Sequence, residues 1–140
     1  MRIALIGCGF FAHNHINAWN DIPNVELVAI CDLNPERLES AAQLASGARK
    51  FHDPLDLFAW GDFDVIDIAT TVNSHHELVM QAAKQNVHII CQKPFAPNLS
   101  DAREMTKAME KTGKVLMVHE NFRWQSAIRA VIEDVRNNVI

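Results

Sequence analysis

The feature that most constrains how this chain folds is the pattern of residues 2–32. Residues 2–6 are an apolar run that predicts a buried strand, and residues 7–12 (Gly-Cys-Gly-Phe-Phe-Ala) follow it directly. A helix comes next, and a second apolar strand over residues 25–30 leads to Asp32. A strand, a glycine turn, a helix, a strand and a terminal acid in one unit match the G-x-G-x-x-G/A fingerprint of dinucleotide-binding domains.

Each residue of the turn has a physical reason to be there. Gly7 lets the chain leave the strand in a tight turn, and Gly9 lacks a Cβ, so the backbone can approach a pyrophosphate closely. Ala12 is small enough for the helix to pack on the strand. Phe10 and Phe11 lie inside this turn and are expected beside the cofactor. The N-terminus of the helix that follows offers N–H groups and partial positive charge to phosphates.

Asp32 indicates which dinucleotide is bound. A carboxylate at the end of the second strand can accept hydrogen bonds from the two ribose hydroxyls of the adenosine half, whereas a 2′-phosphate would meet a like charge. We therefore expect NAD rather than NADP. Two alternatives remain at this point: an ordinary βαβ unit whose glycines serve only packing, and an adenosyl-cofactor site of the methyltransferase type, which needs no pyrophosphate cradle.

Length and charge limit the remaining possibilities. The chain has 140 residues and a net charge of −4, which favours one globular domain and argues against a nucleic-acid or acidic-membrane surface. No apolar run is as long as a membrane span, and the N-terminus leads straight into a strand with no signal-peptide pattern, so a cytoplasmic protein is expected.

The cysteines and histidines do not predict a metal site. Cys8, Cys31 and Cys91 are odd in number and lack Cys-x-x-Cys spacing, so we expect neither a disulfide framework nor a zinc site. Residues His13 and His15 are two apart, which places them on different sides of a helix. His15 is expected to pack under the glycine turn.

The rest of the chain continues the alternation of strands and helices. Further strands are predicted at 49–52, 64–70, 87–91 and 115–119, further helices at 34–47, 54–60, 75–85, 98–113 and 125–137, and loops at 71–74 and 120–124. Ser100 is expected to cap the helix at 98–113. This alternation, with short connections, predicts an α/β, doubly wound parallel sheet of the Rossmann type, with about six strands in the order 3-2-1-4-5-6.

In that topology, ligands bind beyond the carboxyl ends of the strands. Lys93, which follows a buried strand and precedes Pro94, is therefore placed to assist proton removal from a substrate hydroxyl, or else only to contact phosphate or solvent. His75 is expected either to touch the cofactor or to cap a helix, and His119 is a comparable case. Asn121 and Arg123 are expected to contact ribose, carboxamide or substrate, or else to be ordinary loop residues.

Four stretches together resemble the N-terminal domain of the glucose–fructose oxidoreductase / inositol dehydrogenase / MocA family. They are the glycine motif with its trailing histidine (6–15), the second strand (25–32), the loop and helix after strand four (69–77), and a strand ending in Gln-Lys-Pro (87–94). The last resembles the Glu-Lys-Pro strand of the family and is the most diagnostic. The resemblance covers nearly the whole chain.

The resemblance implies a function. The glycine loop and Asp32 would bind NAD, and Lys93 would lie beside the nicotinamide and the hydroxyl being oxidised. Family members oxidise or reduce hydroxyl and carbonyl groups of sugars, inositols and related polyols. By the same resemblance, the side chains along the cofactor would be Thr70, Thr71, His75, Gln92, Asn121 and Arg123.

Two departures from the family pattern bear on this expectation. The glutamate before the lysine is Gln92 here, which can hydrogen-bond a ribose hydroxyl but cannot form an ion pair with Lys93. Family enzymes also carry a second domain with most of the substrate pocket, and residues 124–140 correspond to the start of the crossover towards it.

We therefore expect residues 1–140 to be a dinucleotide-binding domain with absent or very slow turnover alone. The alternatives are a non-catalytic NAD-binding module, a partner subunit that lends its domain to another chain, or a structural remnant. A monomer or weak dimer is expected, with apolar residues exposed on the last helix.

Overall fold

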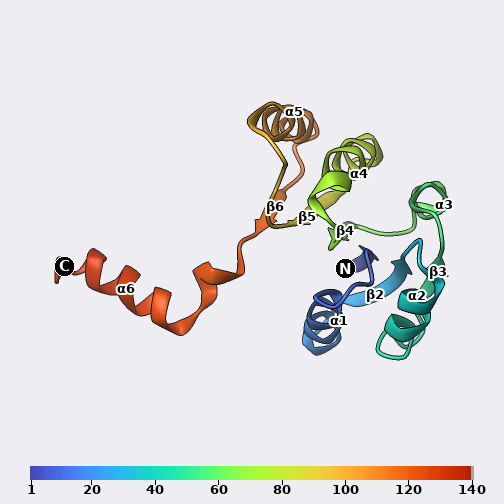
Figure 1. Cartoon of the computed structure of the whole chain (residues 1–140), viewed down its shortest axis with the longest axis horizontal. Coiled ribbons are helices and arrows are strands. Elements are labelled where there is room, and N and C mark those ends of the chain that lie inside the picture. The colour runs from blue at the N-terminus through green and yellow to red at the C-terminus, as the bar shows by residue number, and fades with distance from the viewer. Residues whose placement is uncertain (140) are drawn as a thin grey trace.

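The computed structural model describes residues 1–139, which form a six-stranded sheet with helices on both faces (Figure 1). The strands are β1 (Arg2–Ile6), β2 (Glu26–Cys31), β3 (Arg49–Phe51), β4 (Val65–Ile68), β5 (His88–Gln92) and β6 (Leu116–His119). All neighbouring strands are parallel, and their order is β3-β2-β1-β4-β5-β6. The predicted doubly wound α/β fold is confirmed.

The helices divide between the two faces of the sheet. They are α1 (Ala12–Asp21), α2 (Pro35–Ala42), α3 (Pro54–Trp60), α4 (Val72–Gln85), α5 (Leu99–Glu110), the 3-10 helix η1 (Asn121–Trp124) and α6 (Ser126–Arg136). Ile16 of α1 and Leu38 of α2 share a buried cluster with one face of the central strands. Leu57 of α3, Val79 of α4 and Met105 of α5 belong to the cluster on the other face.

The strand register brings the predicted ligand-binding residues to one edge. Ile6 at the end of β1 pairs with Cys31 of β2 and with Ile68 of β4. Ile68 pairs in turn with Cys91 of β5. Because all strands run in the same direction, the loops that follow them lie along a single edge. The glycine turn, Asp32, Thr70, Lys93 and His119 all belong to this edge.

Two predicted helix boundaries were wrong. The helix α4 begins at Val72, so part of the loop expected at 71–74 is its first turn, in which Ser74 Oγ donates to Thr71 O at 2.9 Å. The helix α2 ends at Ala42 rather than near Gly47. Short polar side chains occur both in loops and in first helical turns, so composition did not separate the two at residues 73 and 74.

Two further local assignments also differ from the prediction. Asn98, rather than Ser100, caps α5, and its side chain accepts from the Asp101 N–H at 2.9 Å. Residues 121–124, expected as a loop, form η1.

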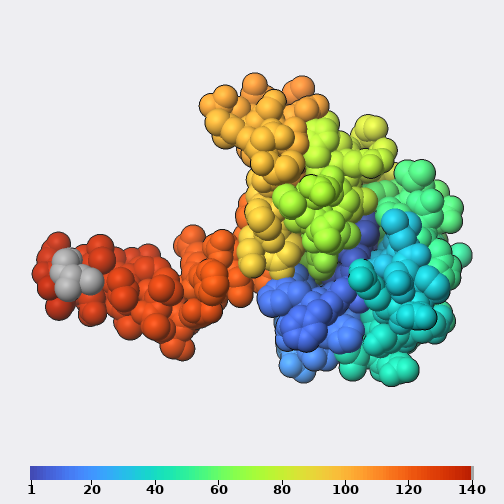
Figure 2. Space-filling view, viewed as in Figure 1, coloured from blue at the N-terminus to red at the C-terminus, as the bar shows by residue number. Residues whose placement is uncertain are grey.

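The last helix extends away from the sheet (Figures 1 and 2). Its aliphatic residues Ile128, Val131 and Val135 are 41%, 47% and 55% exposed, as the sequence predicted for this helix. Among residues 1–139, none of the helices combines the length and the apolar composition that a membrane crossing requires.

Candidate functional site

Gly7 is required by its surroundings. Its φ is +94°, and a Cβ there would lie 2.8 Å from the backbone carbon and oxygen of Ala69 and 2.9 Å from Thr70 Cγ2. Its N–H donates to Cys31 O at 2.8 Å. The turn after β1 is therefore held against β2 and against the loop after β4, and any larger residue would push these elements apart.

Gly9 differs from Gly7, because a Cβ there would meet no other residue within 4 Å. Packing inside the chain does not explain this glycine. Its backbone is open to approach, as a pyrophosphate cradle needs, and its carbonyl accepts from the Ala12 N–H that begins α1 at 3.0 Å. Ala12 is fully buried, which fits its expected packing role, while Phe10 is 91% and Phe11 36% exposed beside the turn.

Asp32 fastens the glycine turn to the end of β2. Its Oδ2 accepts from the Cys8 N–H and its Oδ1 from the Asn34 N–H, both at 2.7 Å. Each carboxylate oxygen has a second lone pair and is able to accept a ribose hydroxyl as well. The sequence predicted the ribose role, but the structural role of this carboxylate was not foreseen.

His75 joins two of the loops at the ligand edge. The side chain is fully buried, its Nδ1 lies 3.1 Å from Pro94 O and 3.2 Å from Phe95 O, and its Nε2 lies 3.2 Å from Thr70 O. It therefore helps to fix the segment that carries Lys93. Its predicted contact with the cofactor stays a prediction.

The two threonines differ in their surroundings. Thr70 is half-buried, and its hydroxyl accepts from Ser74 Oγ at 2.8 Å. Thr71 is exposed just before α4.

Lys93 is exposed immediately after β5, and the Lys93–Pro94 peptide bond is cis. Its backbone N–H donates to Gln92 Oε1 at 2.7 Å. Among residues 1–139, its ammonium group forms no ion pair with a carboxylate. The ammonium group is therefore accessible to a ligand at this edge.

A buried polar cluster lies under the turn, where the sequence predicted the packing of His15 but not its polar partners. Asp67 of β4 is fully buried, and its Oδ2 lies 2.7 Å from His15 Nδ1 and accepts from Trp19 Nε1 at 2.8 Å. The Gln92 side-chain nitrogen lies 3.4 Å from both His15 Nε2 and His119 Nδ1. The one signal in the sequence was a charged residue inside an otherwise apolar strand.

His15, Trp19, Asp67 and His119 of this cluster line a cleft of about 440 Å³ between α1 and the strands β5 and β6. Its lining residues are Phe11, Asn14, His15, Ala18, Trp19, Ile22, Asp67, Ile90, Met117, His119 and Asn121. Among residues 1–139, the buried oxygens Asp67 Oδ1 and Asn121 Oδ1 have no hydrogen-bond partner.

His119 lines this cleft, whereas Arg123 lies outside it. Burial lowers the pKa of His119 below its ordinary value, and His15 adds to this effect. Arg123 is exposed, and its guanidinium lies 5.5 Å from the Trp124 ring centre. The cleft includes Asn121 but not Arg123.

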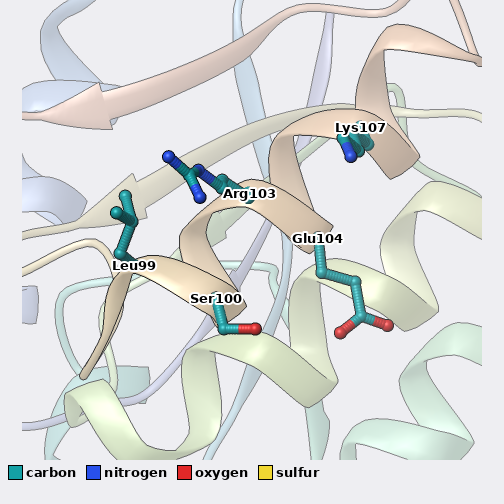
Figure 3. Close-up of a pocket in the computed structure, with 5 residues that line it drawn as sticks. All are labelled: Leu99, Ser100, Arg103, Glu104 and Lys107. Carbon is teal, nitrogen blue, oxygen red and sulfur yellow. The ribbon is translucent and has the colours of Figure 1, made fainter.

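A second hollow, of about 390 Å³, is lined by five residues of α5 alone (Figure 3). None of the predicted site residues lines it. Glu104 points towards α4, where His76 Nε2 lies 3.1 Å from its carboxylate. This hollow is lined by one helix only, and none of the loops at the carboxyl ends of the strands borders it. We therefore do not include it in the candidate site.

The three cysteines are buried thiols within the described part of the chain. Burial is the main reason that the pKa values of Cys8, Cys31 and Cys91 are each raised to about 12. They therefore stay protonated at neutral pH and are poor nucleophiles. No group of three His, Cys, Asp or Glu side chains suited to a metal ion lies within residues 1–139.

Comparisons with known proteins agree with the fold and identify its family. A family model, GFO_IDH_MocA, described as an oxidoreductase family with an NAD-binding Rossmann fold, matches residues 1–120. The D-apiose dehydrogenase of Paraburkholderia graminis is 51% identical over 98% of this chain and 36% of its own length. The myo-inositol 2-dehydrogenase of Thermotoga maritima is 29% identical over the whole chain and 42% of its own length.

Among solved structures, an oxidoreductase from Agrobacterium radiobacter in complex with NAD+, L-tartaric acid and magnesium superposes with a TM-score of 0.94. It is 49% identical, and the match covers 98% of this chain and 40% of that one. The present chain thus spans about two fifths of the length of the proteins that it matches.

Proposed function

The chain belongs to the GFO_IDH_MocA oxidoreductase family, of which it is an NAD-binding Rossmann domain, and from this premise we propose that it serves a dehydrogenase acting on a small sugar or polyol. The observation that carries the proposal is the open backbone at Gly9 within a turn that Asp32 fastens to β2. The reaction is reversible hydride transfer between nicotinamide and a secondary alcohol or carbonyl carbon. The dehydrogenases among its relatives support this substrate class.

The residues of the turn hold the two ends of the adenosine diphosphate half. The backbone around Gly9 and the first N–H groups of α1 contact the pyrophosphate, and Asp32 accepts the ribose hydroxyls. Gly7 and Ala12 keep the turn close enough to β1 for both contacts. Phe10 and Phe11 border the same surface, where their rings exclude water from the phosphates.

We propose NAD rather than NADP as the cofactor. Both oxygens of Asp32 already accept backbone N–H groups, which fixes the carboxylate at the end of β2. A 2′-phosphate at this position would place a second negative charge against it. The NAD+ bound by the relative from Agrobacterium radiobacter is consistent with this choice.

Lys93 is the proposed catalytic residue. Bound nicotinamide supplies the acceptor or donor of hydride. Lys93 holds the substrate hydroxyl and assists the removal of its proton, a role supported by its exposed position between β5 and a loop that His75 fixes. We propose that Thr70, Thr71 and Asn121 border the cofactor from neighbouring loops, with Arg123 beyond them.

A second candidate is a non-catalytic NAD-binding module or a subunit that lends its domain to another chain. The matched residues span 36–42% of the length of its dehydrogenase relatives, so this candidate, like the first, is a proposal for residues 1–140 alone. In that case residues 1–139 would bind NADH without turning over a substrate.

The test is a fluorescence titration of the 140-residue chain with NADH and with NADPH, followed by an assay of polyol oxidation. Saturable binding of NADH that is tighter than that of NADPH supports the cofactor proposal, and the assay then separates the two candidates. Binding of neither nucleotide by a chain whose circular dichroism shows it to be folded would contradict the proposal.

A further inference from the structure

The orientation of the Gln92 amide is set by a backbone group. The Lys93 N–H lies 2.7 Å from the side-chain oxygen of Gln92, and an N–H can pair only with an acceptor. The NH₂ group of the amide must therefore face the other way. On that side lie His15 Nε2 and His119 Nδ1, each 3.4 Å from the amide nitrogen. Both contacts are long, so Lys93 rather than the histidines decides which way the amide points.

The proton on His15 is located by a second fixed group. The indole of Trp19 can only donate, so Asp67 Oδ2 acts as an acceptor, and His15 Nδ1 lies 2.7 Å from that same oxygen. His15 Nδ1 therefore carries a proton. In the neutral imidazole, Nε2 then has a lone pair, and that lone pair faces the amide hydrogens of Gln92.

The same reasoning applies to His119 at the end of β6. An amide hydrogen of Gln92 needs a lone pair on His119 Nδ1, which leaves the proton of the neutral ring on Nε2. The rings of His15 and His119 also pack against each other, 4.6 Å apart and nearly perpendicular. The Nε2–H of His119 is on the far side of its ring from Gln92.

We propose that Gln92 is a positioning residue that fixes the protons of His15 and His119, so that His119 offers an N–H donor to a ligand at the carboxyl edge of the sheet. The two NH₂ hydrogens of one amide match the two imidazole lone pairs. A glutamate at this position has no hydrogens to donate. To pair with it, His15 would have to bind a further proton, and His119 would have to move its proton to Nδ1 or bind a second one, so the Nε2–H tautomer of His119 would no longer be selected. The amide at position 92 is thus explained by the two histidines that face it.

The charges around His119 agree with a neutral ring. Burial and His15 of α1 lower its pKa, whereas Asp67 of β4 and Glu120 next to it in the chain act in the opposite direction. The lowering causes are the larger ones. A glutamate in place of Gln92 would add a carboxylate within contact of both rings and reverse this balance.

The consequence for ligand binding rests on the proposed function. If the nicotinamide end of the cofactor or the substrate lies against His119, the Nε2–H selects an acceptor there, such as a carbonyl or hydroxyl oxygen. With a proton already on Nε2, His119 cannot remove a proton from the substrate through that atom. This agrees with Lys93 as the residue that assists removal of the hydroxyl proton.

The test is nitrogen-15 NMR of the imidazole rings in the labelled 140-residue chain, with long-range proton–nitrogen correlations recorded as a function of pH. The signals of His15 and His119 are assigned by their loss in His15→Gln and His119→Gln. We expect the Nδ1–H tautomer for His15 and the Nε2–H tautomer for His119 in the parent chain. The opposite tautomer at His119, or a protonated His119 at neutral pH, would overturn the proposal.

Two substitutions separate positioning from packing. Gln92→Glu is expected to raise the pKa of His119 by about one pH unit or more, because a carboxylate favours the protonated ring. Gln92→Leu, of similar size but without donors or charge, should release the His119 tautomer without that rise. A His119 pKa that is the same in Gln92→Glu as in the parent chain would contradict the proposal, and the parent tautomers decide it if a variant does not fold.

The NMR experiment requires no nucleotide. Tautomers as proposed in a chain that fails to bind NADH would therefore overturn the proposed function while leaving the role of Gln92 intact. NADH binding with the opposite tautomers would do the reverse.

Discussion

The two halves of the sheet differ in how fully they are enclosed. Around β1 and β2, the Gly7 N–H donates to Cys31 O and the Cys8 N–H donates to the Asp32 carboxylate, and Ile16 of α1 is completely buried. Around β6, by contrast, the strand is only partly buried, and the side chains of α6 point into solvent. The difference teaches that the geometry of the cofactor turn is set within the first half of the chain, whereas α6 contributes little to the stability of residues 1–139.

The largest loss of stability is expected for a substitution at Gly7, in the enclosed half of the sheet. Gly7→Val should lower the free energy of unfolding by about 4 kcal/mol, because a β-branched residue is strained at positive φ and its Cβ would overlap Ala69. Urea denaturation followed by circular dichroism measures this loss.

Gly47→Val is the matched control for Gly7→Val. Gly47 also has positive φ, +85°, but a Cβ there meets no other residue within 4 Å. We expect Gly47→Val to lower the free energy of unfolding by only about 1–2 kcal/mol, the cost of a non-glycine residue at positive φ. Equal losses of unfolding free energy in the two variants would show that the close approach of Ala69 to Gly7 does not add to the cost of a side chain there.

A smaller loss is expected where the two halves meet, at the buried carboxylate of β4. Asp67→Ala removes the acceptor of both His15 and Trp19 and should cost about 2–3 kcal/mol, since two buried donors lose their partner. Urea denaturation measures it. Asp21→Ala, at the exposed end of α1, should stay within about 0.5 kcal/mol of the parent chain. If Asp67→Ala changed the free energy of unfolding as little as Asp21→Ala, the hydrogen bonds of Asp67 with His15 and Trp19 would contribute no net stability.

Asp32 tests whether the enclosed half also determines the cofactor. Asp32→Ala should weaken NADH binding by about tenfold, corresponding to roughly 1.4 kcal/mol, and should narrow the advantage of NADH over NADPH. Fluorescence titration with both nucleotides measures the two effects.

Asp32→Asn is the control, because it keeps one acceptor for a backbone N–H and removes the charge. It should narrow the preference with a smaller loss of NADH affinity. An unchanged preference in both variants would remove Asp32 from the choice of cofactor.

The smallest effect is expected on α6 and would sharpen the comparison. Val131→Ala should change the free energy of unfolding by no more than about 0.5 kcal/mol, because Val131 is 47% exposed. Val79→Ala makes the same change at a fully buried site of α4 and should cost about 2 kcal/mol. Thermal and urea unfolding of the two variants measures both losses. Equal losses of unfolding free energy in Val131→Ala and Val79→Ala would contradict the comparison.

Much of the fold was predictable from the sequence, because its signals are local. Apolar runs marked the strands, Pro35 and Pro54 marked helix starts, and the glycine turn with Asp32 marked one complete βαβ unit. Helix ends were less predictable. The polar residues at the starts of α4 and α5 suit a loop, a cap or a first turn, and only the hydrogen bonds that they form distinguish these roles.

The candidate site was predictable only in part. Its position at the carboxyl ends of the strands followed from the topology, and Lys93 and Asp32 lie there as expected. The partners of these residues did not follow. The sequence predicted a ribose contact for Asp32 and a cofactor contact or cap for His75, but not that Asp32 anchors the turn or that His75 bridges two loops.

The sequence by itself determined the strand order, the family and the place of the dinucleotide turn, because these depend on residue patterns within short windows. Only the tertiary structure decided which polar side chains meet. His15 and Asp67 are 52 residues apart in the chain, and His15 and Gln92 are 77 apart. Their contact depends on the register of β4 and β5 and on the rotation of α1 above them. Hydrogen bonds have strict distance and angle limits, so this pairing, and with it the reason for Gln92, exists only in the folded sheet.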